Sequence, residues 1–201
     1  MAYTLAIFDL GGVVVEVESD RLVSQVSQLV GVPFDAVRAA VYHEELLLPF
    51  ELGRITATAY YEGLVAQLKI PWTYDQFVRA WNGIFRENAE TVALMRRLRQ
   101  HHRLVALTNT NKLHLAHIQS TLSSPNVFDQ WFASCDLGFR KPDAAIYQLV
   151  LKRTGVNPHE AVYVDDRPEL IEAGQQVGLT AIRFESVRQL EADLRKAGVA
   201  F

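Results

Sequence analysis

Five short, uninterrupted apolar runs constrain the fold of this chain more than any other feature. They lie at 5–8, 104–108, 131–134, 161–164 and 180–184. Strands that are buried on both faces have continuous rather than alternating apolar residues, as in a parallel sheet. The stretches between the later runs carry apolar residues at helical spacing, for example Val92, Met95 and Leu98. Strands that alternate with helices predict an α/β fold, a doubly wound parallel sheet with a Rossmann-like core.

The segment 17–85 interrupts this alternation. It contains no convincing strand and four helical patterns, which lie near 20–30, 35–48, 56–68 and 73–85. A segment of this length exceeds an ordinary crossover between two strands. We therefore expect an α/β core formed by 1–16 and 86–201, with 17–85 inserted after the first strand as a helical cap.

Composition and charge exclude several classes of partner. The chain has 201 residues, 49% of them hydrophobic, and a net charge of −3, so it has no positive field for nucleic acid or an anionic membrane. Its one basic cluster, at 96–103, falls where a helix is expected to end and where cations are favoured. We expect neither nucleic-acid nor membrane binding.

The cellular compartment is indicated by features that the sequence lacks. The single cysteine, Cys135, cannot form an internal disulfide, which suits a reducing compartment. There is no secretory segment at the start, and no apolar run approaches the ~18 residues that span a bilayer. We expect a cytoplasmic protein, and the sequence does not indicate its oligomeric state.

Polar side chains gather where the predicted strands end. They are Asp9, Thr108 with Asn109, Asp165 with Asp166, and Lys141 in the loop after the run at 131–134. Ligands of open α/β sheets bind beyond the carboxyl ends of the strands, so these residues should converge. Three carboxylates repel one another, and one lysine cannot neutralise them, whereas a hard divalent cation can. Oxygen ligands without clustered thiols favour Mg²⁺ over zinc.

Four motifs at these strand ends resemble those of the haloacid dehalogenase superfamily. They are "FDLGGVV", "ALTNTN", "GFRKPD" and "VYVDDRPELIEAGQQVG", and they span essentially the whole chain. The arrangement is similar to the phosphatase branch with a helical, C1-type cap, and to bacterial sugar-phosphate phosphatases of the glucose-1-phosphate kind. The resemblance implies a Mg²⁺-dependent hydrolase of a small phosphorylated metabolite, for which we expect a sugar phosphate.

The resemblance also implies a role for each motif residue. Asp9 would attack phosphorus and form an aspartyl-phosphate. Thr108, the amide of Asn109 and the ammonium of Lys141 would hold the non-bridging phosphate oxygens.

The same resemblance implies the metal ligands. Asp9, the backbone carbonyl of Gly11 and Asp166 would hold Mg²⁺, and Asp165 would support it directly or through another ligand. A chain that turns tightly enough to aim a carbonyl at a metal is easiest to build from glycines such as Gly11 and Gly12.

One position departs from the superfamily pattern. Phosphatases of this kind usually carry a second aspartate two residues after the nucleophile, as general acid and base, and here that residue is Gly11. General acid catalysis contributes typically ~10²–10⁴-fold, so another group supplies it or the substrate needs little help. The candidates for this role are Glu16, His43, Glu44, Glu45 and Glu51.

Several alternative functions remain open at this point. A carbon–halide hydrolase of the superfamily also lacks the second acid, but it needs no metal and would leave Asp165 and Asp166 as adjacent uncompensated acids. A weakened phosphate-binding homologue and a phosphosugar mutase are further alternatives. A response-regulator receiver shares the Asp, Thr and Lys set, but in the reverse chain order and without a cap. His114 and His117 are expected on a solvated or cap-facing surface rather than in a second metal site.

Overall fold

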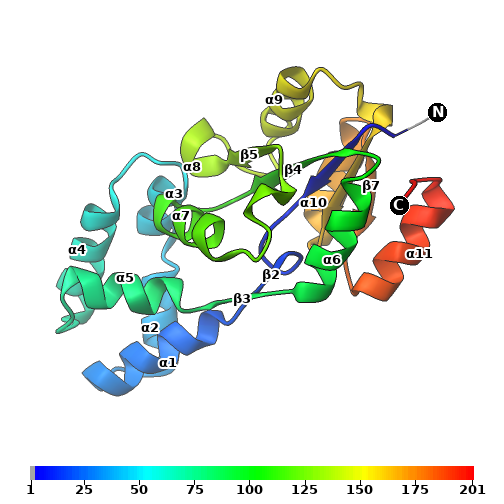
Figure 1. Cartoon of the computed structure of the whole chain (residues 1–201). Helices are drawn as coiled ribbons and strands as arrows, with labels where there is room; N and C mark the ends of the chain where they lie inside the picture. Colours follow the sequence, from blue (N-terminus) through cyan, green and yellow to red (C-terminus); the bar gives the residue numbers. More distant parts are fainter. Residues whose placement is uncertain (1–2) are drawn as a thin grey trace.

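A five-stranded parallel sheet forms the centre of the molecule in the computed structural model, which describes residues 3–201 (Figure 1). The strands run in the order β5-β4-β1-β6-β7. Their bounds are Leu5–Phe8 for β1, Arg103–Thr108 for β4, Gln130–Ala133 for β5, Ala161–Asp165 for β6 and Thr180–Arg183 for β7. All five predicted strands are therefore confirmed, with each end within one residue of its apolar run.

Both faces of the sheet are covered by helices, as the continuous apolar runs predict. Alternate residues of the central strand β1 enter two different clusters, since successive side chains of a strand point to opposite faces. Ala6 and Phe8 pack with α6 (Ala89–Leu98) and α11 (Val187–Ala197). Leu5 and Ile7 pack with α9 (Ala144–Thr154) and α10 (Pro168–Gln176). This is the doubly wound arrangement.

The shorter elements of this part are α7 (Lys112–Thr121), η1 (Pro125–Val127), α8 (Ser134–Leu137) and η2 (Pro158–Glu160).

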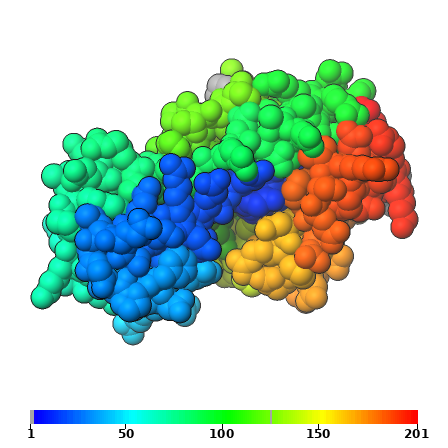
Figure 2. Space-filling view, turned by 90° about the horizontal axis from the view of Figure 1, so that it is seen from below, coloured from blue at the N-terminus to red at the C-terminus, as the bar shows by residue number. Residues whose placement is uncertain are grey.

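Five further helices form what we call the helical lobe. They are α1 (Ser19–Val30), α2 (Phe34–Val41), α3 (Glu44–Glu51), α4 (Ala57–Leu68) and α5 (Tyr74–Asn82). Their buried residues form a cluster separate from those of the sheet, with stacked Phe50 and Tyr60 at its centre. Figure 2 shows dark-blue N-terminal residues at the surface between this lobe and the orange and red C-terminal helices. Among the described residues, no helix combines the length and the apolar character that crossing a bilayer requires.

The lobe corrects one helix prediction. The pattern at 35–48 is divided between two helices, because α2 ends at Val41 and α3 begins at Glu44. The carbonyl of Val41 accepts a buried hydrogen bond of 2.6 Å from Tyr60 Oη. That contact satisfies a carbonyl at the end of α2 from outside the helix, which the local sequence pattern does not reveal.

A two-stranded antiparallel ribbon, which the sequence analysis missed, joins the lobe to the sheet. Strand β2 (Val15–Val17) pairs with β3 (Phe85–Glu87), so Val17 and Phe85 are extended where no strand was expected. Strands of three residues are too short to give a periodic pattern. The predicted boundaries at 17 and 85 fall within this ribbon, and the division into core and cap stays a prediction.

The lobe also contacts α8, the short helix that follows β5, at the end of α3. The carbonyl of Glu51 accepts a hydrogen bond of 2.7 Å from Ser134 Oγ. Gly53 has a left-handed φ of 66°, and a Cβ there would lie 2.2 Å from the carbonyl oxygen of Cys135. Only glycine therefore allows this close approach.

We predict that Gly53→Ala destabilises the protein more than Gly31→Ala. Gly31 has nearly the same φ, 67°, but a Cβ there meets nothing within 4 Å. Gly31→Ala should therefore lower the free energy of unfolding only by the cost of a left-handed alanine, about 1–2 kcal/mol. Gly53→Ala should cost a further ~1–3 kcal/mol through overpacking. Urea unfolding measures both, and equal losses would show that the contact with Cys135 is not tight.

Candidate active site

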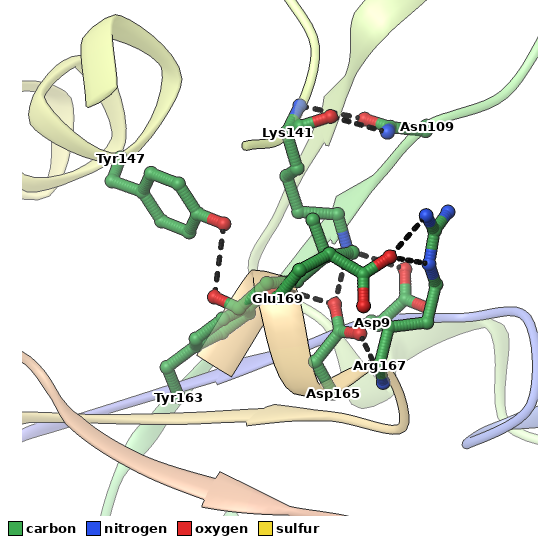
Figure 3. Close-up of polar contacts among 9 residues, drawn as sticks. Asp9, Asn109, Lys141, Tyr147, Tyr163, Asp165, Arg167 and Glu169 are labelled. Carbon is green, nitrogen blue, oxygen red and sulfur yellow. Dashed lines mark hydrogen bonds and ion pairs between the residues drawn. The ribbon is translucent and has the colours of Figure 1, made fainter. Parts of the chain in front are cut away.

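A buried lysine lies between two aspartates at the carboxyl edge of the sheet (Figure 3). Asp9 directly follows β1, and Asp165 ends the neighbouring strand β6. Lys141 Nζ lies 2.8 Å from Asp9 Oδ1 and 2.6 Å from Asp165 Oδ2, and the lysine side chain is 1% exposed. Burial disfavours its charge, but the two carboxylates more than offset this and raise the Lys141 pKa. The lysine is therefore held as a cation beside Asp9.

Asn109 holds the loop that carries this lysine. Its side-chain amide donates to the carbonyl of Lys141 at 2.9 Å, and its Oδ1 accepts from the N–H of Lys141 at 2.8 Å. The side chain of Asn109 is thus committed to positioning Lys141. Only its backbone amide is left for the predicted phosphate contact, which stays a prediction.

Asp165 is surrounded by donors on both of its oxygens. Oδ2 accepts from Lys141 and from the hydroxyl of Tyr163, and Oδ1 accepts from the N–H of Arg167 at 3.0 Å. Tyr163 was missed because its apolar strand predicts only core residues. Its position two residues before Asp165 is the available signal, since such residues share one face of a strand. The bonds to Asp165 favour a supporting role over direct metal ligation.

The third carboxylate, Asp166, has a buried oxygen without a partner. Asp166 Oδ1 has no hydrogen-bond donor among the described residues. Ligand oxygens of Asp9, Asp165 and Asp166 lie within 4.8 Å of one another. Burial raises the pKa of Asp9 to about 6, against the opposing charge of Lys141, and burial with the charge of Asp165 raises that of Asp166. An unpartnered, desolvated carboxylate oxygen such as Asp166 Oδ1 is a ligand that a hard divalent cation would satisfy.

The glycine turn after Asp9 is tighter at one residue than at the other. Gly12 has a φ of 79°, and a Cβ there would lie 2.4 Å from Asp166 Oδ2. A Cβ on Gly11 would meet only Val17 Cγ2, at 3.3 Å, and the backbone of Gly11 is not in the left-handed region. The turn therefore requires glycine at position 12, whereas position 11 needs only a small shift of Val17 to accept a side chain.

Two adjoining cavities meet at Thr108, the last residue of β4. The first, which we call the aspartate cleft, has about 360 Å³ and is bordered by Asp9, Lys141 and Asp166. The second, which we call the lobe cavity, has about 210 Å³ and lies between the sheet edge and the helical lobe. Gly11, Val17, Thr108 and Asn109 line both cavities. A phosphate bound at Asp9 would therefore have room beside it for an attached group.

Glu51 alone, of the five acid candidates predicted from sequence, lines the lobe cavity. Glu16 is exposed and ion-paired with Arg86, and His43, Glu44 and Glu45 are exposed. The Glu51 side chain is 18% exposed and lies 3.1 Å from Arg140. Burial raises its pKa, against the charges of Arg140 and Arg167.

The two histidines after the second motif do not form a metal site with other described residues. His114 faces the lobe, where it stacks on Trp81 at a centroid distance of 4.7 Å. His117 is half-buried, with its ring 6.3 Å from that of Phe85.

Comparisons with known proteins agree with this geometry. A model of the family described as "Hydrolase: haloacid dehalogenase-like hydrolase" matches residues 3–178. The chain is 26% identical to a D-ribitol-5-phosphate phosphatase of Bacteroides thetaiotaomicron, over 90% of this chain and 91% of that one. It is 28% identical to the sesquiterpene phosphatase astK of Aspergillus oryzae, over 90% of each chain.

Solved structures share the fold. A HAD family enzyme from Bacteroides thetaiotaomicron in complex with magnesium and inorganic phosphate has a TM-score of 0.82 at 20% identity, and covers 92% of this chain and 95% of its own. The L-2-haloacid dehalogenase from Xanthobacter autotrophicus has a TM-score of 0.67 at 16% identity, and covers 99% of this chain and 85% of its own. Because a dehalogenase shares this fold, the fold alone does not identify the reaction, and the side chains of the site must do so.

The unpartnered oxygen of Asp166 predicts opposite effects of Asp166→Asn with and without a divalent cation. In a chelator the variant should be more stable than the wild type by roughly 1–3 kcal/mol, because it removes a desolvated charge without a partner. With saturating Mg²⁺ the wild type should gain stability by binding the ion, and the variant should gain much less. Thermal unfolding in the two buffers measures this. Equal shifts for both proteins would exclude Asp166 as a ligand.

Proposed function

The chain belongs to the haloacid dehalogenase-like hydrolase family, and on this basis we propose that it hydrolyses a phosphomonoester of a small metabolite. The observation that carries the proposal is the pairing of Lys141 with Asp9 beside the unpartnered Asp166 oxygen. A nucleophile, a cation for a phosphate and an unpartnered carboxylate oxygen for a metal meet there. A carbon–halide hydrolase needs no metal, so the unpartnered oxygen favours the phosphatase.

The proposed reaction starts at Asp9. Lys141 binds Oδ1, and Oδ2 is the oxygen that would attack phosphorus. The new Oδ2–P bond forms as the bond from phosphorus to the leaving oxygen breaks, and water later hydrolyses the aspartyl-phosphate and restores Asp9. Thr108, the backbone amide of Asn109 and a remaining N–H of Lys141 would hold the phosphate oxygens.

Mg²⁺ is proposed as the cofactor. Asp9, Asp166 and the carbonyl of Gly11 would hold it, with Asp165 supporting the site through its bonds to Lys141 and the Arg167 backbone. When bound, the ion shields the nucleophilic carboxylate from the negative charge of the substrate.

The narrower proposal is a sugar or polyol phosphate as substrate. The relative named for D-ribitol-5-phosphate supports it, and so do the motifs similar to glucose-1-phosphate phosphatases. The relative named for sesquiterpene phosphates is equally similar, so a phosphate-release screen should include both kinds of ester.

We predict that Asp9→Asn abolishes phosphate release while the fold persists. An amide is too weak a nucleophile to form the phospho-enzyme. Release from a panel of sugar phosphates, nucleotides and terpenyl phosphates is measured for wild type, Asp9→Asn and the surface control Asp136→Asn, with Mg²⁺ and with a chelator. Only Mg²⁺-supplied wild type and control should be active. Retained activity in Asp9→Asn would remove Asp9 from the nucleophilic role, and chelator-resistant activity on haloacids would support the dehalogenase.

We further propose that Glu51 carries the proton that an aspartate at position 11 would otherwise carry. It lines the lobe cavity together with Gly11 and Thr108. Its backbone carbonyl accepts a hydrogen bond from Ser134, the residue that directly follows β5. Burial raises its pKa, which increases the share of molecules that hold the proton.

This role predicts a dependence on the leaving group. Glu51→Gln should lower kcat on glucose 6-phosphate by ~10²-fold or more, since a primary alcohol leaves poorly without a proton. It should lower kcat less on glucose 1-phosphate, whose anomeric oxygen is a better leaving group. Gly11→Asp in the Glu51→Gln background should restore part of the loss, and Glu45→Gln serves as the exposed control. If kcat falls equally on both esters, or if only KM changes, Glu51 does not carry the proton. Its role would then be to position the lobe through its ion pair with Arg140.

A further inference from the structure

We propose that the lobe cavity selects phosphoesters whose leaving group carries no negative charge. The inference rests on the proposed phosphatase function and concerns the part of the substrate that lies beyond the phosphate. It excludes phosphorylated carboxylic acids and bisphosphates, and it admits polyols, sugars and apolar alcohols.

The first support is the charge of the cavity wall. Among the described residues that line the lobe cavity, none is lysine or arginine, and Glu51 is the one carboxylate. Much of the remaining wall is apolar and comes from Leu47, Trp81, Ile84, Phe85 and Ile118. A second anion placed here would lose its water and meet no positive charge. Whether Glu51 holds its proton or not, it offers such an anion no counter-charge.

The second support is that the one histidine of the wall is neutral. Asn111 Oδ1 accepts from the backbone N–H groups of Leu113 and His114, which fixes the orientation of its amide. Its Nδ2 is therefore the donor to His114 Nδ1 at 3.1 Å, so this ring nitrogen carries no proton.

The other ring nitrogen completes the assignment. His114 Nε2 lies 3.1 Å from the carbonyl of Trp81 and must donate to it, because a carbonyl only accepts. The ring is thus held as the neutral Nε2–H tautomer, and burial lowers its pKa to about 3. Its hydrogen bonds and its position against the rings of Trp81 and Phe85 oppose the second proton that binding an anion would need.

The third support is that the nearby cations are already engaged. Arg140 pairs with Glu51. Lys141 is shared by two aspartates and faces the aspartate cleft, where it serves the phosphate. Arg167 pairs with Glu169 on the side of the cleft and does not line the lobe cavity. The positive charge of the site is therefore confined to the phosphate position.

Two matched substrate pairs test the inference. 2-Hydroxyethyl phosphate and 2-phosphoglycolate differ by a carboxylate in place of a hydroxymethyl group, as do glucose 1-phosphate and glucuronic acid 1-phosphate. The kcat/KM of each is measured with Mg²⁺, and each is also tested as a competitive inhibitor of p-nitrophenyl phosphate hydrolysis. The neutral member of each pair should be favoured on the order of 10²-fold, because an uncompensated or repelled charge costs several kcal/mol.

A charge introduced into the wall should reverse this preference. Leu47→Arg should raise kcat/KM for 2-phosphoglycolate and lower the discrimination about tenfold or more. Ser19→Lys, at another residue that lines the cavity, repeats the test if the first variant does not fold. Leu29→Arg adds the same charge at an exposed site of the lobe and should change nothing.

The outcomes separate the two proposals. The inference about a neutral leaving group would be overturned by two results together. The wild type would have an equal or higher kcat/KM for the anionic member of each pair, and the wall variants would not change the ratio. The phosphatase proposal would then still stand. No phosphate release from any ester, p-nitrophenyl phosphate included, would overturn the phosphatase itself and this inference with it. Discrimination that both wall variants weaken and Leu29→Arg leaves intact would establish the charge of the lobe cavity as its cause.

Discussion

The ion pair between Lys141 and Asp9 is the interaction on which the rest of the site depends. A buried ammonium is costly unless it is paired and hydrogen-bonded, and here each partner comes from a different part of the fold. Asp9 and Asp165 come from adjacent strands, and the Asn109 side chain holds the lysine backbone from a third. The sheet order therefore determines the chemistry, because only neighbouring parallel strands bring these ends together.

The carboxyl edge of the sheet carries more negative than positive charge. One lysine faces three carboxylates, and the Asp166 oxygen has no donor in the described chain. A metal ion would supply the positive charge that balances these carboxylates, and the Lys141 ammonium beside Asp9 would bind a phosphate. The lobe cavity next to them has the opposite character, apolar with a neutral histidine and one carboxyl group. The two adjoining cavities would thus suit the two ends of the proposed substrate, a phosphomonoester whose leaving group is uncharged.

The sequence predicts the sheet and the convergence of polar residues at its edge well, because both follow from local signals. Apolar runs fix the five strands, and the polar residues at their ends converge at one edge by the geometry of parallel strands. The split between α2 and α3, the pairing of Val17 with Phe85, and the roles of Asn109 and Tyr163 depend on partners distant in sequence. Glu51 could be chosen among five candidates only once its position in the cavity was known.

The β2–β3 ribbon has a mechanical consequence. Both chain passages into the lobe are bonded to each other, and Val15 also accepts from Gly12 N–H at 2.8 Å. Because β2 and β3 are hydrogen-bonded to each other, they resist sliding past one another. The ribbon can still bend as one unit. A swing of the lobe would therefore tilt the turn that carries the Gly11 carbonyl. The position of the lobe and the orientation of the Gly11 carbonyl would then change together.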